Sequence, residues 1–191
     1  GAPAARRHAF PSPAVDLAEL MYVTPLAPYA DENYTHGCAA VTHEDIRWGR
    51  CNIKSINLLG NVFAAQYAKE RGAFEALLVN KAGRVLEGSH TNLFWVRNGV
   101  LGTAPLTENI LPGTTRERVL SAAAQQGIAV DYSPLSADML KACDEVFITA
   151  TTIEVMPVRS IDGTMIGEPG PVTGRLLRAY RADVDRFLSM P

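Results

Sequence analysis

Residues 47–61 read RWGRCNIKSINLLGN, and this stretch places Lys54 directly before a run of apolar residues. Apolar side chains at helical spacing predict a helix from about Ser55 to Arg71, with Gly72 as its stop. If the start of that helix is buried, desolvation would favour a neutral Lys54 amine, which could carry out Schiff-base chemistry. The alternative is an ordinary surface lysine at a helix start.

Strand and helix patterns follow one another irregularly outside this stretch. Short apolar runs bounded by turn residues predict strands at 17–24, 38–43, 74–79, 91–97, 100–103, 128–132, 145–150 and 155–161. Hairpin turns are predicted at Asn98-Gly99 and Asp162-Gly163. Further helices are predicted over 114–127, 136–142 and 172–188. Because strands and helices mix without strict alternation, we expect a mixed α/β (α+β) domain and not a doubly wound parallel sheet.

Two pairs of threonines could bind an anion. Thr114 and Thr115 lie at a predicted helix start, where free N–H groups and the helix dipole favour negative charge. Thr151 and Thr152 follow an apolar strand, at a strand-to-loop junction of the kind that often holds a ligand. The alternatives are a plain helix cap, with Thr114 and Glu117 as a capping box, and an ordinary polar loop. The sequence contains no glycine-rich nucleotide-binding motif, which disfavours a nucleotide triphosphate site.

Several charged residues are further candidates. Glu87 lies between a short apolar run and a glycine turn, where its carboxylate could face a site or simply be solvated. Arg6 and His8 could bind a carboxylate, or belong to a solvated terminal segment. We interpret Asp45 and Arg47 as an ordinary ion pair, at the surface or around a site.

Composition limits the class of protein. The chain has 191 residues, 47% hydrophobic and 20% charged, with a net charge of −2, which indicates one globular domain, or one and part of another. This charge argues against nucleic-acid and membrane partners, and no apolar run is as long as a membrane span. The three cysteines lack metal-ligand spacing and the four histidines are scattered, so we expect no metal site. Reduced thiols are the simplest interpretation, and we expect a cytoplasmic protein.

Four segments together resemble the fold-type IV pyridoxal-phosphate enzymes, and among these they look most like D-amino-acid aminotransferases. Residues 47–61 resemble the family's lysine segment, and LEGSHTNLF at 86–94 resembles its glutamate motif. ILPGTTR at 110–116 resembles its phosphate loop, and FITATTIE at 147–154, followed by Pro157, resembles its second phosphate loop. The segments occur in the family's order and spacing and cover almost the whole chain.

The resemblance implies a pseudo-barrel domain that binds pyridoxal 5′-phosphate. Lys54 would form the internal aldimine and move the proton at the substrate α-carbon, and Glu87 would pair with the pyridine nitrogen. One leucine packed on the ring and three threonines at the phosphate would complete the cofactor site: Leu111, Thr114, Thr115 and Thr151. Arg6 and His8 match the positions at which D-amino-acid aminotransferases bind the substrate α-carboxylate.

The resemblance also implies a domain organisation and a partner. Residues 1–14 would be the end of a smaller N-terminal domain with its linker, and residues 15–191 the large cofactor-binding domain. Relatives are homodimers with the site near the subunit interface, so we expect a second copy as partner. Two positions depart from the family: Ala150 stands where relatives often have serine, and His90 replaces a small hydroxyl residue.

The implied activity is transfer of an amino group between a D-amino acid, such as D-alanine, and a 2-oxo acid. Alternatives within the same fold are a branched-chain amino acid aminotransferase and an aminodeoxychorismate lyase. A non-catalytic relative that keeps the fold as an interaction module is the alternative from another class.

Overall fold

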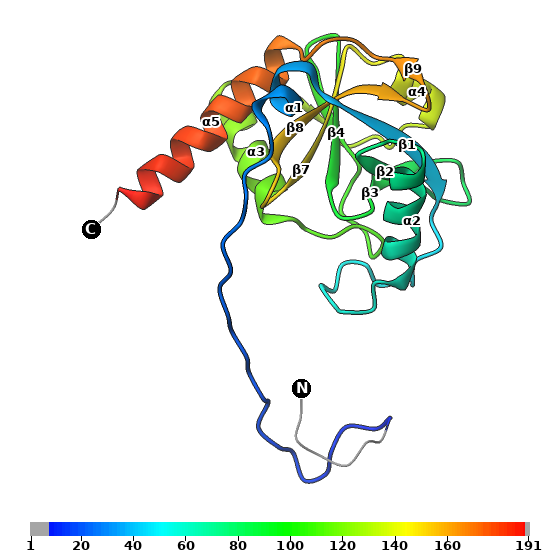
Figure 1. The fold of residues 1–191 in the computed structure, drawn as a ribbon, viewed down its shortest axis with the longest axis vertical. Helices are drawn as coiled ribbons and strands as arrows, with labels where there is room; N and C mark the ends of the chain where they lie inside the picture. Colours follow the sequence, from blue (N-terminus) through cyan, green and yellow to red (C-terminus); the bar gives the residue numbers. More distant parts are fainter. Residues whose placement is uncertain (1–7, 190–191) are drawn as a thin grey trace.

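The structure is a computed structural model that describes residues 8–189 (Figure 1). Its elements are, in chain order, α1 (Asp31–His36), β1 (Cys38–Glu44), α2 (Leu59–Glu70), β2 (Glu75–Val79), β3 (Val85–Gly88), β4 (Asn92–Arg97), β5 (Val100–Thr103), α3 (Thr114–Gln125), β6 (Val130–Asp131), α4 (Ala137–Lys141), β7 (Glu145–Ala150), β8 (Glu154–Ile161), β9 (Thr164–Met165) and α5 (Pro171–Leu188). None of the helices in this described range is both long and apolar enough to cross a membrane.

The strands form one mixed sheet in the order β3-β2-β1-β8-β7-β4-β5-β6, with β9 paired to β8. β1 runs parallel to both β2 and β8, whereas β4 pairs antiparallel with β5 and β7. This arrangement confirms the predicted mixed α/β class, because a doubly wound sheet would be mostly parallel. In Figure 1, α3 and α5 lie together beside β7, and α2 lies beside β1 and β2.

Side chains of β4 and β7 alternate between two cores. Leu93 and Ile148 belong to the larger apolar cluster. Phe94 and Phe147 point to the opposite face, where their rings stack with centroids 5.0 Å apart in the cluster that includes α3 and α5. The same alternation places the side chains of Asn92 and Thr149, which are paired across β4 and β7, on the face of the phenylalanines.

A buried carboxylate attaches α5 to the sheet. Glu145, the first residue of β7, accepts hydrogen bonds from the backbone N–H groups of Val172 (3.0 Å) and Thr173 (2.7 Å) and from the Thr173 hydroxyl (2.6 Å). A negative group at a helix N-terminus satisfies the N–H groups that lack intrahelical partners and is favoured by the helix dipole. The start of α5 is therefore fixed to the start of β7.

The backbone angles at Asn98-Gly99 and Asp162-Gly163 are those of tight hairpin turns. Asn98 and Gly99 have φ values of 51° and 75°, and Asp162 and Gly163 have φ values of 50° and 78°. Two consecutive residues with positive φ are what a tight hairpin with the sheet's twist requires. Both predicted hairpins therefore form, between β4 and β5 and between β8 and β9.

The strand predicted over 17–24 is wrong. Residues 8–30 contain no helix or strand and form an extended arm that runs away from the packed body (Figure 1). The arm joins the body at its end, where the ring of Tyr29 contacts Phe74. Apolar side chains on this arm are almost fully exposed, including Leu20 (88%), Met21 (92%) and Val23 (92%). An apolar run becomes a strand only where a neighbouring strand can form a ladder with it, and the sheet of the described residues does not include residues 17–24.

Candidate active site

Glu87 is a buried carboxylate at the end of the sheet where β3 finishes. Its side chain accepts hydrogen bonds from Arg47 Nη1 (2.5 Å), Asn92 Nδ2 (3.0 Å) and the backbone N–H of Leu111 (3.1 Å). Burial raises the pKa of Glu87 to about 7, although the hydrogen bond and positive charge of Arg47 act in the opposite direction. The carboxyl group therefore exchanges its proton near neutral pH and could meet a cationic ligand atom.

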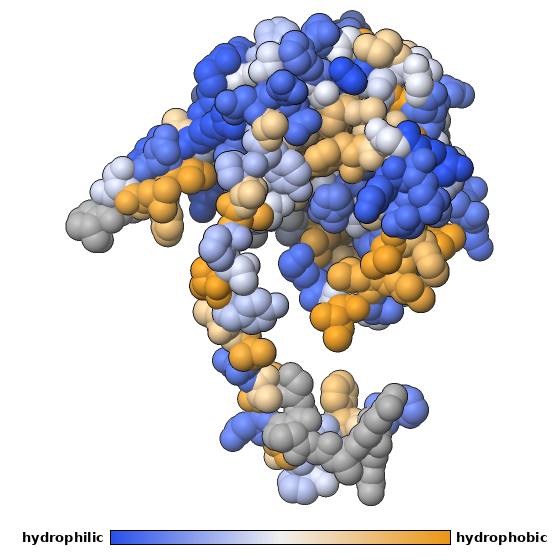
Figure 2. All heavy atoms as spheres, in the orientation of Figure 1, coloured by the Kyte–Doolittle hydropathy of each residue, from blue (hydrophilic) through white to orange (hydrophobic). Residues whose placement is uncertain are grey.

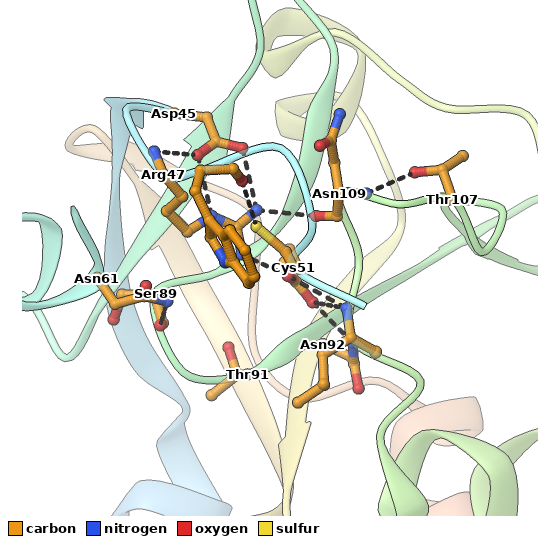
Figure 3. Close-up of polar contacts among 12 residues, drawn as sticks. Asp45, Arg47, Cys51, Asn61, Ser89, Thr91, Asn92, Thr107 and Asn109 are labelled. Carbon is orange, nitrogen blue, oxygen red and sulfur yellow. Dashed lines mark hydrogen bonds and ion pairs between the residues drawn. The ribbon is translucent and has the colours of Figure 1, made fainter. Parts of the chain in front are cut away.

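Arg47 connects this carboxylate to a second one. Its guanidinium contacts Asp45 through Nε (2.9 Å) and Nη2 (3.0 Å), and Nη2 also donates to the backbone carbonyl of Asn109 (2.9 Å) (Figure 3). Burial alone would lower the pKa of Arg47, but its bonds to Asp45 and Glu87 raise it above the ordinary value. The Arg47 and Asp45 side chains are only 4% and 10% exposed, so the ion pair is buried beside the site.

The N-terminus of α3 lies against Asn92. The N-cap residue is Gly113, and no side chain within residues 8–189 caps the helix, so the capping box predicted for Thr114 and Glu117 is wrong. A Cβ on Gly113 would clash with the side-chain oxygen of Asn92, whose amide also donates to the Leu111 carbonyl (2.8 Å). The first N–H groups of a helix have no intrahelical partner, which leaves them available to an anion.

A hydroxyl group without a partner lies on the same face. Thr149 is 1% exposed, and its Oγ1 is buried with no hydrogen-bond partner in the described part of the chain. Thr149 lies opposite Asn92 on the neighbouring strand, so its side chain faces the side of the sheet on which α3 begins. Because buried hydroxyl groups are normally hydrogen-bonded, this one is available to a polar ligand or a water molecule.

Thr151 and Thr152 form the exposed turn that follows β7. The turn begins two residues after Thr149 and therefore borders the same region. Thr115 is buried in the first turn of α3, Thr114 is exposed beside it, and Leu111 is half-buried. The turn after β7 and the start of α3 are thus linked to Glu87 through the pairing of Thr149 with Asn92 and the contact of Asn92 with Gly113.

Lys54 is exposed, contrary to the expectation of a buried amine. Helix α2 begins at Leu59 and not at Ser55, which leaves Lys54 in an irregular segment that the helix does not cover. The backbone N–H of Asn52 bonds to the Glu108 carbonyl (3.0 Å). This bond holds the lysine segment against the loop that continues to Leu111 and thus to the contacts of Glu87.

The structure does not test the two residues predicted to bind the substrate carboxylate together. Arg6 lies outside the described residues, and His8 is exposed at the start of the arm. Within residues 8–189 no cluster of three or more histidine, cysteine, aspartate or glutamate side chains could hold a metal ion.

The ion pair interpreted for Asp45 and Arg47 is confirmed, whereas sequence reasoning missed the contact of Arg47 with Glu87, the contacts of Asn92 and the position of Thr149. Asn92 lies within the glutamate motif, five residues after Glu87, and a polar residue at the start of an otherwise apolar strand was the available signal. Thr149 carries the same signal at the end of β7. Arg47 gave no such signal, because its partner Glu87 is distant in sequence and belongs to another strand.

Comparisons with known proteins agree with this geometry. The family model described as amino-transferase class IV matches residues 2–161. The D-alanine aminotransferase of Bacillus licheniformis is 42% identical over 156 residues, which cover 81% of this chain and 55% of that protein. The D-alanine aminotransferase of Staphylococcus aureus strain N315 is 38% identical over 185 residues, which cover 95% of this chain and 64% of that protein. The chain thus spans little more than half the length of these relatives.

Solved structures show the same fold. The branched-chain amino acid aminotransferase of Escherichia coli superposes with a TM-score of 0.74 at 34% identity, over 83% of this chain and 55% of that one. The branched-chain amino acid aminotransferase of Thermobaculum terrenum, in its PLP-form, has a TM-score of 0.76 at 29% identity, over 82% of this chain and 54% of that one.

Proposed function

The chain belongs to the class IV aminotransferases, and on this premise we propose that it works in a pyridoxal-phosphate-dependent transaminase acting on D-amino acids. The reaction transfers an amino group between a D-amino acid, such as D-alanine, and a 2-oxo acid. One observation carries the proposal: a buried carboxylate with a pKa of about 7 and an anion site with an unpartnered buried hydroxyl lie at the same end of one sheet.

The residues of this site suit pyridoxal 5′-phosphate at both of its ends. Thr114, Thr115 and Thr151 would hold the phosphate with the first N–H groups of α3, and the Thr149 hydroxyl supplies a further donor. Glu87 would pair with the ring nitrogen, and the three donors on its carboxylate fix its orientation. When bound, the cofactor supplies an electron sink for the substrate α-carbon.

Lys54 would provide the amine that attaches the cofactor and then moves the proton at the substrate α-carbon. Its exposure in this chain leaves Nζ accessible to both reagents. Leu111 would pack on the ring, because its backbone N–H already bonds to Glu87 and its side chain is half-buried beside it. The expectation that residues 1–14 belong to a second domain stays a prediction; regular structure begins at Asp31.

We place the substrate carboxylate with Arg6 and His8, and this requires a second copy of the chain. The arm that carries His8 is lined with exposed apolar residues, and apolar side chains are also exposed around the start of α2 (Figure 2). The members of this second group are Ile56, Leu59, Val62 and Phe63. Burial of both surfaces in a homodimer would remove them from water, and the arm could bring His8 to the partner's site. The three free, buried cysteines support a cytoplasmic protein.

The test is to mix the purified protein with pyridoxal 5′-phosphate, record the visible spectrum, reduce with borohydride and map the modified peptide. We expect a pyridoxyl group on Lys54, and a shift of the spectrum when D-alanine is added before reduction. A response to L-leucine and not to D-alanine would favour the branched-chain activity named for the structural neighbours. A folded protein without the Lys54 modification would contradict the proposal.

A further inference from the structure

Glu154 has a backbone conformation that is unusual for its residue type. It follows the turn of Thr151, Thr152 and Ile153, begins β8, and has a φ of 54°. This left-handed region suits glycine, because a Cβ there crowds the backbone. A glutamate in this position therefore requires contacts that compensate for the unfavourable conformation.

The compensating contact comes from α5. Arg181 donates from Nε and from Nη2 to Oε2 of Glu154, both at 2.7 Å. The Arg181 guanidinium also lies over the ring of Tyr34 in α1, 4.8 Å from its centroid. The Arg181 and Glu154 side chains are 45% and 29% exposed, so the pair is shielded from solvent only in part.

Helix α5 has the length needed to connect this pair to the other end of β7. The helix rises about 15 Å between Pro171 and Arg181, at roughly 1.5 Å per residue. Strand β7 covers about 17 Å between Glu145 and Ala150, at roughly 3.3 Å per residue. Glu145 fixes the start of α5, and Arg181 meets the residue after the turn, so α5 braces both ends of the strand.

The turn is closed by the antiparallel pairing of Ala150 with Glu154, where β7 meets β8. Ile153, the last residue of the turn, is fully buried in the larger apolar cluster and anchors the turn to it. A cavity of about 280 Å³ adjoins Thr151 and Thr152, and Glu154, Arg181 and Tyr34 are among the residues that line it. On this side the Arg181–Glu154 ion pair ties the end of the turn to α5.

We propose that Arg181 is a positioning residue for the Thr151–Thr152 turn and that it acts through Glu154. The inference rests on the proposed function, in which this turn binds the phosphate of the cofactor. Helix α5 lies outside all four motif segments of the chain, and through Arg181 it would help to set the affinity for the phosphate. Arg181 itself need not touch the cofactor.

The test compares Arg181→Gln with Arg178→Gln, which removes the same charge from an exposed position one turn earlier on α5. Affinities are measured for pyridoxal 5′-phosphate and for pyridoxal, which lacks the phosphate. We expect Arg181→Gln to weaken binding of pyridoxal 5′-phosphate roughly tenfold while leaving pyridoxal binding unchanged. Arg178→Gln should change neither. An equal loss for both ligands would mean general destabilisation and would overturn the proposal.

A second variant tests the route through Glu154. Glycine adopts a φ of 54° without strain, so Glu154→Gly should make the turn independent of Arg181. Adding Arg181→Gln to Glu154→Gly should then cause no further loss of phosphate-dependent affinity. A full additional tenfold loss would show that Arg181 acts by another route and would overturn the inference.

Hydrogen exchange of the backbone amides of residues 150–154 separates this inference from the proposed function, since it needs no cofactor. In the unliganded protein, Arg181→Gln should accelerate exchange in this turn and Arg178→Gln should not. If the unaltered protein binds no pyridoxal 5′-phosphate, the proposed function fails, and the exchange result still decides whether Arg181 holds the turn. Unchanged exchange in Arg181→Gln would refute the inference that Arg181 holds the turn.

Discussion

Glu87→Gln should change how the stability of the unliganded protein depends on pH. Burial raises the pKa of Glu87 from an ordinary 4.5 to about 7 in the folded state. Between these two values the folded state holds a proton that the unfolded state has released, so stability falls as pH rises. One pKa unit corresponds to about 1.4 kcal/mol, which gives a loss of about 3 kcal/mol between about pH 4 and pH 8.

The glutamine variant resembles the protonated carboxyl group and lacks this titration. The amide also places a donor against the groups that donate to Glu87, which is a cost that does not depend on pH. We therefore expect the stability of the variant, relative to that of the unaltered protein, to rise by about 3 kcal/mol between about pH 4.5 and pH 8. Urea unfolding at a series of pH values measures the difference, with Glu19→Gln on the exposed arm as the matched control. Parallel pH profiles for Glu87→Gln and the unaltered protein would refute the reasoning.

Repeating the pH series with bound cofactor tests whether the ring nitrogen lies beside Glu87. A cationic ring nitrogen beside Glu87 would favour the charged carboxylate and lower its pKa. Saturation with pyridoxal 5′-phosphate should therefore reduce the pH dependence that Glu87 causes in the unliganded protein. A pH dependence that persisted unchanged with bound cofactor would place the ring nitrogen away from Glu87.

Three further substitutions test separate parts of the site and its support. Lys54→Ala should lower transamination by about 10³-fold or more and remove the pyridoxyl label. Thermal unfolding should stay unchanged, as for Lys81→Ala, because both lysines are exposed. Gly113→Ala should displace the Asn92 side chain and cost about 1–3 kcal/mol of stability, measured by urea unfolding, together with weaker cofactor binding in a titration. Glu145→Gln should place an amide donor against the first N–H groups of α5, and lower the free energy of unfolding by about 2 kcal/mol.

Sequence predicted the elements whose causes are local. Asn98-Gly99 and Asp162-Gly163 adopt positive φ because of their own residue types, and Ser136 caps α4 by accepting a hydrogen bond from Met139. Residues 17–24 had the composition of a strand but lacked a partner strand, and composition alone cannot supply one. The late start of α2 also has a non-local cause, because the backbone of Asn52 bonds to Glu108 and holds the preceding segment in a loop.

The candidate site also contains features that the local sequence predicts and features that depend on tertiary contacts. The motifs located Glu87 and the threonines, because each has a characteristic neighbourhood in the chain. The burial of Glu87, its link through Arg47 to Asp45 and the unpartnered hydroxyl of Thr149 depend on which strands lie side by side. The exposure of Lys54 likewise follows from where α2 begins and not from the composition of the lysine segment.

The two ends of the proposed cofactor site are held by different parts of the molecule. Glu87 is oriented by Arg47, which follows β1, by Asn92 at the start of β4, and by the Leu111 backbone in the loop before α3. The phosphate end consists of the start of α3 and the turn after β7, and that turn is braced by α5. Asn92, which bonds to Glu87 and lies against Gly113, contacts both ends. Changes around Arg47 should therefore act on protonation, whereas changes along α5 should act on affinity, and Asn92 is where the two effects would couple.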